Sequence, residues 1–374
     1  MDTATVHLHR GFGPRLGTLT SVSGVNRVWN LMQTSPGAVT VALDDPLVLE
    51  CDPRAGNAVV IESPAYPHPW VGAITRLDRS KRDGTARLTL VSAEAVLQHR
   101  YLPSTSDYTA QQRTAAAVFA DIIQTINLAN DSEVGIDDDL DQGPIYAGAF
   151  PDRSALGALN AVAQASGMEW GVSYQVDERR IVATASIRTA LGENRTATVF
   201  EDGTEGVETL EDAIDMGGAP WLLHLVGGQA DVLDAYTERS RSARRQGAAY
   251  PVTGAGEAPR ALIHGFAIEH AARAGSPFTR TEALYVAEEL KSAGAVDAAA
   301  AALAGRPRWA ERILRLSIGA QHEERWRDCD LGSVVRFRST DAFLTGCDVP
   351  VRIVSVQPTE EAGELIFTAQ VLEG

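Results

Sequence analysis

Cysteine and lysine are scarce in this chain of 374 residues. The three cysteines, Cys51, Cys329 and Cys347, follow neither the spacing of a zinc site nor that of a Cys-x-x-Cys redox pair. An odd number of cysteines is typical of free, buried thiols in a reducing compartment. Lys81 and Lys291 are the only lysines, so arginine carries nearly all of the positive charge.

The sequence also lacks long apolar runs and any excess of positive charge. No run approaches the roughly 20 apolar residues of a membrane-spanning helix, and the first residues lack the pattern of a secretory signal. We therefore expect no membrane span. The formal net charge of -16 disfavours binding to nucleic acid or anionic membranes. With 44% hydrophobic residues, a chain of this length is expected to form two to four globular domains.

The common catalytic and nucleotide-binding motifs are absent as well. The sequence contains no His-Glu-x-x-His, no Gly-x-Ser-x-Gly and no phosphate-binding loop. Paired carboxylates carry little information in so acidic a chain. We therefore expect no catalytic residue, no cofactor-binding residue and no metal site. That expectation favours a structural or interaction protein over an enzyme.

Two histidines have the spacing of metal ligands on a strand. His7 and His9 are separated by one residue, so both would point to the same side of a strand. They stand close to the N-terminus, in a segment that we expect to be frayed. Solvent-exposed or structural histidines are the better interpretation.

An acidic segment resembles the first half of a calcium-binding loop. Its members are Asp137, Asp139, Asp141 and Gly143. The pattern then fails, because Gln142 stands where such a loop needs glycine and Gly148 stands where it needs glutamate. A solvated turn is the simpler prediction.

Two later clusters are equally weak candidates. His264 and His270, with Glu269, have a spacing that does not place them on one face of a helix or a strand. The basic cluster that contains Arg239, Arg241, Arg244 and Arg245 is short and has Ser and Glu neighbours. It is typical of a solvated loop or an interface loop rather than a nucleic-acid patch.

The strongest pattern is a β-module that occurs twice. Each copy has a short strand that begins with glycine, a loop, a long strand, a turn that contains glycine and a final strand. The first copy covers 56–60, 70–77 and 85–91, and the second covers 332–337, 349–356 and 364–371. We expect 71–91 and 351–371 to superpose as equivalent hairpins. A chain that builds one module twice is usually solving a geometric problem.

The segment after the first copy predicts helices and then strands. A helix through 114–123, capped by Ser106 or Asp107, places apolar side chains on one face, at 115, 118, 119, 122, 123 and 126. A second helix over 154–166, capped by Asp152, should end at Gly167. Strands over 169–176 and 180–187 follow.

The remaining segment predicts a strand at 221–226, a long helix over 281–303 before Pro307, and a strand at 312–318. Altogether we expect a multidomain α+β protein. Its predicted parts are a first β-module at 1–104, an α+β domain at 105–207, a discontinuous second β-module at 208–234 and 308–374, and an inserted helix-containing segment at 235–307 that packs with the α+β domain.

This order of elements resembles that of a known family. The phrase Asp330-Leu331-Gly332-Ser333-Val334-Val335 and the strand 351–356 carry the resemblance, together with the first module and the helix closed by Arg306 and Pro307. The chain resembles the tail-hub, or baseplate hub, proteins of long-tailed bacteriophages. These are related to the N-terminal part of tail-associated lysins.

The resemblance implies two tail-tube-like β-barrels in each subunit of a homotrimer. Six barrels would then form a ring that adapts the sixfold tail tube to a threefold tip. The implied partners are a distal tail protein or tail tube ring, a tape-measure protein and a tip or fibre protein. DNA would pass through the lumen without specific binding, and the formal charge of the trimer, 3 × -16 = -48, would repel it from the wall.

The implied location is the tail tip of the virion, after assembly in the host cytoplasm. The sequence ends at Gly374, directly after the second module, so we expect any enzymatic or receptor-binding task to belong to other chains. Two alternatives remain open. One is a tail-associated cell-wall-degrading or peptidase enzyme. The other is a receptor- or carbohydrate-binding tail tip protein, which the aromatic content of 6% disfavours.

Overall fold

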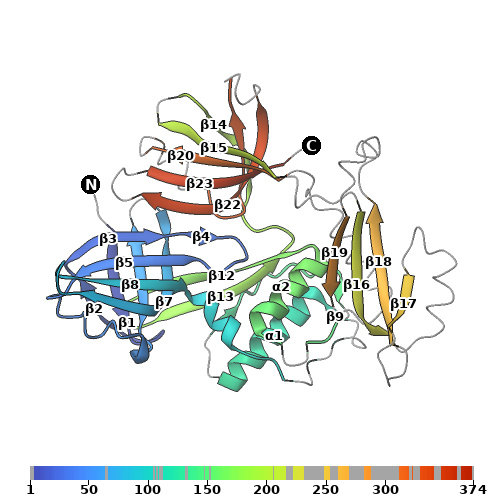
Figure 1. Cartoon of the computed structure of the whole chain (residues 1–374), viewed down its shortest axis with the longest axis horizontal. Coiled ribbons are helices and arrows are strands. Elements are labelled where there is room, and N and C mark those ends of the chain that lie inside the picture. The colour runs from blue at the N-terminus through green and yellow to red at the C-terminus, as the bar shows by residue number, and fades with distance from the viewer. Residues whose placement is uncertain are drawn as a thin grey trace.

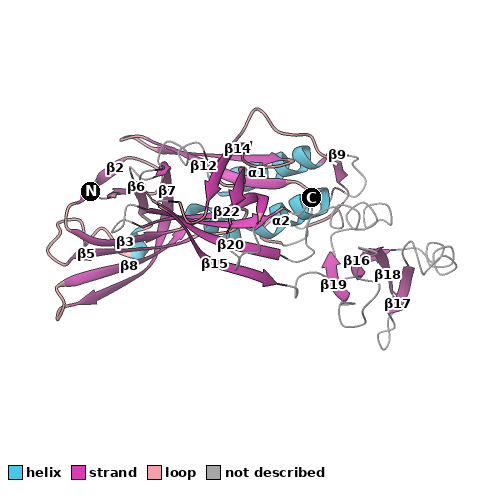
Figure 2. Cartoon of the chain, turned by 90° about the horizontal axis from the view of Figure 1, so that it is seen from above, coloured by secondary structure: helices cyan, strands magenta, loops and turns pink. Residues whose placement is uncertain are grey.

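The structure of the chain is a computed structural model. It describes residues 4–63, 66–103, 106, 108, 113–130, 134–146, 148–150, 153–204, 206–215, 222–230, 248–252, 260–268, 282–287, 311–319, 322, 329–340, 347–359 and 364–372. These residues form a mainly β protein with few helices, which belongs to the α+β class (Figure 1). Figure 2, the view from above, shows the strands in magenta and the few helices in cyan.

The N-terminal part of the chain folds into a seven-stranded sheet with the order β2-β1-β6-β7-β8-β5-β3. Alternate residues of β8 are buried, as a strand with one face on a core requires. We call this sheet the first module. Its strands are β1 (Thr5–His9), β2 (Arg15–Leu19), β3 (Val22–Arg27), β5 (Pro36–Ala42), β6 (Ala58–Ser63), β7 (Tyr66–Ser80) and β8 (Thr85–Ser92).

The C-terminal part forms another sheet with the order β14-β21-β22-β23-β20-β15, which we call the second module. Its strands are β14 (Asn194–Glu201), β15 (Val207–Asp215), β20 (Glu311–Ile318), β21 (Val334–Arg338), β22 (Asp348–Thr359) and β23 (Glu364–Val371). Neither sheet closes into a barrel within the described residues, because the strands at its two ends do not pair with each other. In Figure 1 the second module, mostly red, lies above the blue first module.

The two modules have the same order of strands, both along the chain and across the sheet. In chain order, the strands β1, β3, β5, β6, β7 and β8 correspond to β14, β15, β20, β21, β22 and β23, and each set pairs in the same sequence of neighbours. One orientation differs: β1 is antiparallel to β6, whereas β14 is parallel to β21. The predicted repeat therefore extends beyond its hairpins to six strands.

The register of the hairpins corrects the predicted alignment by one residue. The pairs that close the two turns are Ser80 with Thr85 and Thr359 with Glu364, a shift of 279 residues from β7 to β22 and from β8 to β23. Each long strand also has its irregularity five residues before its last residue. Gly72 rather than Val71 is therefore the counterpart of Val351. Apolar residues lie close to this point in both strands, such as Val71 and Ile74 in β7 and Val351 and Ile353 in β22, so the sequence pattern alone did not fix the register.

The middle of the chain forms a small α+β domain. Its helices α1 (Ala115–Asn130) and α2 (Ala155–Ser166) pack beside the hairpin of β12 (Glu169–Val176) and β13 (Ile181–Arg188). The predicted apolar face of α1 is confirmed, because Ala115, Val118, Phe119, Ile122, Ile123 and Ile126 are all buried. The remaining elements are β9 (Arg113–Thr114), β10 (Val134–Ile136) and β11 (Ile145–Tyr146).

Both predicted N-caps are wrong. The Thr114 hydroxyl, rather than Ser106 or Asp107, accepts a hydrogen bond from the Ala117 N–H at 3.3 Å. The Ser154 hydroxyl, which accepts from the Gly157 N–H at 3.2 Å, replaces Asp152. In each case the residue directly before the helix has the geometry to reach the N–H three residues ahead. The predicted end at Gly167 is confirmed, with φ of 70°.

The region between β15 and β20 contains a separate sheet. Its four strands, in the order β17-β18-β16-β19, are β16 (Leu222–Ala230), β17 (Ala248–Val252), β18 (Arg260–Ile268) and β19 (Glu282–Ala287). The strand predicted at 221–226 thus exists, but it lies outside the second module. The predicted helix over 281–303 is wrong at its start, because 282–287 pair with β16 as a parallel strand. The rest of that helix lies outside the described residues.

The predicted boundary at 207 also separates strands that pair with each other. β14 lies in the range assigned to the α+β domain, but it pairs with β21 of the second module. This pairing joins residues that are far apart in the sequence. The other domain limits remain predictions.

Candidate functional site: the junction between the modules

A two-residue strand from the first module extends the sheet of the second. This strand, β4 (Trp29–Asn30), lies in the connection between β3 and β5 and pairs with Ser355 and Val356 of β22. The adjoining Leu31 N–H donates a hydrogen bond to the Val354 carbonyl at 3.0 Å. Strand pairing fixes both distance and register, so the two modules are held by backbone hydrogen bonds as well as by side chains.

Two aromatic side chains, Trp29 of β4 and Tyr66 of β7, pack together at the junction. Tyr66, at the start of β7, is 3% exposed and packs in the core of the second module although it belongs to the first. Its ring meets Trp29 edge to face, with 4.8 Å between the ring centroids. The Leu331 N–H donates a hydrogen bond to the Tyr66 hydroxyl, and burial raises the pKa of this phenol. The neutral side chain therefore stays in place across the physiological pH range.

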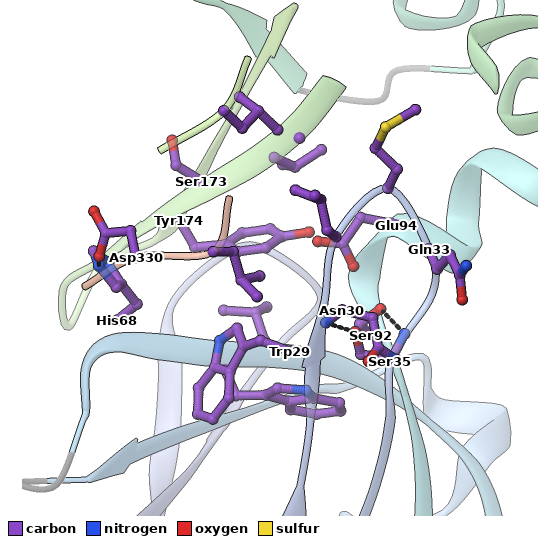
Figure 3. A pocket seen from close by; sticks show the side chains of 18 of the residues that line it. Trp29, Asn30, Gln33, Ser35, His68, Ser92, Glu94, Ser173, Tyr174 and Asp330 are labelled. Atoms are coloured by element: carbon purple, nitrogen blue, oxygen red, sulfur yellow. Dashed lines mark hydrogen bonds and ion pairs between the residues drawn. The ribbon is translucent and has the colours of Figure 1, made fainter. Parts of the chain in front are cut away.

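The rim of the junction carries a polar pair. His68 Nε2 and Asp330 Oδ1 are 2.5 Å apart, and both side chains are half-exposed. The serines of the same cavity are engaged elsewhere: the Ser92 hydroxyl accepts from the Ser35 N–H at 2.8 Å, and the Ser35 hydroxyl accepts from the Asn30 N–H at 2.9 Å. Figure 3 shows these serines on the other side of Trp29 from His68, so the histidine is not placed to activate them.

The α+β domain forms the third wall of the junction. Glu169 of β12 and Arg352 of β22 form an ion pair whose side chains are 14% and 17% exposed. The pair also holds the chain at Leu191, whose N–H donates to the Glu169 carboxylate at 2.8 Å and whose carbonyl accepts from Arg352 at 3.1 Å. This network joins the α+β domain to the second module.

A carboxylate joins the same domain to the first module. Glu94 lies in the 3₁₀ helix η2 (Ala93–His99), next to the Tyr174 hydroxyl of β12. Burial raises the pKa of Glu94 and also that of Tyr174. Two cavities, of about 300 and 450 Å³, meet at Glu94. Together their walls come from the three parts of the chain, so the three parts meet at this junction.

The histidine pair is structural, but the prediction of a frayed N-terminus is wrong. β1 pairs with β2 and with β6, and both His7 and His9 are buried. The His7 ring contacts the Thr18 hydroxyl at 3.0 Å and the Glu62 carboxylate at 3.2 Å. Burial and the nearby Arg15 lower the pKa of His7. Such a ring stabilises the sheet and offers no open coordination position.

The aspartates of the supposed calcium loop tie the domain together instead. Arg188 pairs with Asp137 at 3.0 Å and with Asp139 at 3.2 Å, while Asp141 accepts a hydrogen bond from the Thr189 N–H at 2.6 Å. The Asp139 N–H, which donates to the Asp137 carboxylate at 3.1 Å, and then Arg188 lower the pKa of Asp137, and the Thr189 N–H lowers that of Asp141. Within the described ranges, no group of three or more His, Cys, Asp or Glu side chains could hold a metal ion.

The other candidates are placed only in part. His264 lies in β18, and Glu269, His270 and the arginine cluster at 239–245 lie outside the described residues. The three cysteines are free and buried, and burial raises the pKa of Cys51 to about 11. In the part of the chain that the structure describes, no helix is long and apolar enough to cross a membrane.

The sequence pattern does not predict the junction. A two-residue strand gives no periodic pattern, and Tyr66 stands in a proline-rich segment that predicts a loop. The available signal was the presence of two large aromatic residues, Trp29 and Tyr66, in segments without a predicted helix or strand. Such residues need a partner surface.

Comparison with known proteins gives matches at the level of structure. No family model matches the sequence, and no curated protein matches it. A 43 kDa tail protein of prophage MuSo2 from Shewanella oneidensis is similar over 98% of both chains, with a TM-score of 0.60 and 13% identity. A tail protein from Neisseria meningitidis MC58 is similar over 100% of this chain and 97% of its own, with a TM-score of 0.57 and 10% identity.

A third similar structure is the prophage tail protein gp18 from Listeria monocytogenes EGD-e. The similarity covers 97% of this chain and 94% of that one, with a TM-score of 0.52 and 10% identity. Identities this low establish the fold and nothing beyond it. The chain therefore has the fold of phage and prophage tail proteins, in agreement with the tail-hub type that the sequence resembles.

Proposed function

We propose that the protein is a structural component of a phage tail, a homotrimeric hub at the distal end of the tail tube. The observation that carries the proposal is the repeated module: six strands with the same order along the chain and across the sheet. A homotrimer of a chain with two equivalent modules presents six of them. It can therefore contact a sixfold tube on one side and a threefold tip on the other.

The junction supports this function, because an adaptor must hold its modules at a constant angle. Strand pairing, the buried Tyr66 side chain and the Glu169–Arg352 pair all act between parts of the chain. The partners of such a hub would be a distal tail protein or tube ring, a tape-measure protein and a tip or fibre protein. With a net charge of -16 for each chain, the lumen would let DNA slide without binding.

Mass measurement in solution tests the proposal. Sedimentation equilibrium should give three chains of 39.9 kDa, and class averages of the particles should show a ring. A single-chain mass at all concentrations, also with a tube ring present, would contradict it. Reproducible lysis of host cell walls, lost when one acidic pair is replaced, would favour a tail enzyme instead.

A further inference from the structure

The two modules differ in what lies along one edge of the long strand. In the second module, β21 pairs with β22 up to Arg352, and β4 then pairs with the same strand at Ser355 and Val356. In the first module, β6 pairs with β7 up to Ala73. Within the described residues, no strand occupies the part of this edge of β7 that follows. Residues 75–80 of β7 are the counterparts of 354–359.

The segment that covers this edge in the second module comes from β3 and β4. β3 lies beside β22, and the Gln357 side-chain amide donates a hydrogen bond to Asn26 Oδ1 at 3.4 Å. The counterpart of β3 is β15, which is an end strand of the second module as β3 is of the first. Beside β7 the equivalent position holds no docked strand, although the 3₁₀ helix η1 (Pro53–Ala55), which precedes β6, contacts β7. The joint within the chain therefore has an equivalent in which β7 is the acceptor and β15 is the strand that could dock.

The pairing registers identify the residues that would meet. Gln357 corresponds to Asp78, by the shift of 279 residues. Asn26 corresponds to Glu211. In the first module Asn26 pairs with Ala38, which pairs with Thr89 of β8. In the second module Glu211 pairs with Arg315, which pairs with Thr368 of β23, the counterpart of Thr89.

Charge complementarity is a second and independent observation. Residues 76–84, the end of β7 and the turn that follows, contain three Arg and one Lys against two Asp. β15 contains four acidic residues, Glu208, Glu211, Asp212 and Asp215, and no Lys or Arg, and Asp212 pairs with Arg312 of β20. The Arg76 side chain is 72% exposed, and Leu210 of β15 is a large apolar side chain that is 46% exposed. A basic edge and an acidic edge on one chain favour head-to-tail contact between copies.

We infer that β15 of one copy docks beside residues 75–80 of β7 in the next copy, as β3 docks beside β22 within each chain. The contact places Glu211 of one copy beside Asp78 and Arg76 of the next. The Arg76 guanidinium then bridges the carboxylates of Asp78 and Glu211. One joint within the chain and one equivalent joint between chains alternate around the ring and close it. The inference rests on the proposed trimer and specifies the interface that would form it.

Cysteine cross-linking tests this interface. In the full-length chain, Asp78→Cys with Glu211→Cys is treated with a short bis-maleimide and run on a denaturing gel. We expect products with the mass of two and three chains, absent from each single variant. The matched control is Asn26→Cys with Gln357→Cys, which should cross-link within one chain. The native cysteines are all buried and should react little.

The outcomes separate the interface from the trimer. A mass of three chains without the cross-linked products, while the control pair reacts, would overturn the inference and leave the hub intact. A mass of one chain would overturn both.

Charge reversal gives an independent check. Arg76→Glu should raise the dissociation constant of the assembly about twofold to fivefold for each contact, the size of an exposed ion pair. Adding Glu211→Arg should restore it. An unchanged dissociation constant in the single variant would count against the docking of β15 on β7.

Discussion

The two modules share their interior and differ at their edges. β8 and β23 bury alternate residues in the same pattern, and their counterparts Leu88 and Phe367 are both buried. At the edges, the connection between β3 and β5 is short and contains β4, whereas the connection between β15 and β20 runs from 216 to 310 and contains a four-stranded sheet. A repeated core can thus be kept while the connections adapt each copy to its place in an assembly.

The start of β7 is another place where the two modules differ outside their shared interior. β7 begins at Tyr66, but β22 begins at Asp348, the counterpart of Pro69. The additional residues of β7 place Tyr66 in the core of the second module. The first module therefore contributes both the strand and the aromatic anchor of the junction, and the second module receives them.

The largest expected effect comes from removing that anchor. Tyr66→Ala should lower the free energy of unfolding by about 3–5 kcal/mol, since a buried aromatic ring leaves a cavity between the modules. Denaturant unfolding followed by fluorescence measures it, and we expect the modules to unfold in separate transitions. Tyr101→Ala, at a side chain that is 64% exposed, is the control. A loss below about 1 kcal/mol in Tyr66→Ala would contradict the assigned role.

A smaller effect should distinguish two equivalent glycines. Gly56 and Gly332 precede β6 and β21 at the same distance, with φ of 67° and 85°. A Cβ at Gly56 would meet nothing within 4 Å, but at Gly332 it would lie 2.2 Å from the Leu191 carbonyl oxygen.

We therefore expect Gly56→Ala to cost about 1–2 kcal/mol from the left-handed backbone alone. Gly332→Ala adds a steric clash and should cost about 3 kcal/mol or more. Thermal unfolding of both variants measures the difference. Equal losses would show that the contact with the α+β domain does not distinguish the two sites.

The smallest effect concerns Glu94, beyond the end of the first hairpin. Burial raises the pKa of Glu94 in the folded protein. Folding is therefore favoured when the carboxyl is protonated, and this contribution is lost as the pH rises through the folded-state pKa. Glu94→Gln should be more stable than the native chain at neutral pH, by about 1 kcal/mol, and equally stable near pH 4. Urea unfolding across this range, with Glu178→Gln as control, checks it. A pH-independent difference would contradict the assignment.

The sequence predicted what depends on local pattern. The alternation in 85–91 and 364–371 predicted the hairpins, and the spacing of apolar residues predicted the buried face of α1. It failed where distant pairing decides. The segment 282–287 is helix-compatible in composition, but pairing with β16 makes it a strand. The junction was not predicted, since β4 is too short for any periodic signal and its strand partner, β22, is far away in the sequence.

The central claim is that the two modules are equivalent positions in one ring. An electron cryomicroscopy map of the assembled protein tests it most directly. We expect threefold symmetry with six similar densities about 60° apart, in which the hairpins β7–β8 and β22–β23 superpose after rotation about the ring axis. Hairpins that face unrelated surfaces, or an assembly without a ring, would contradict the account.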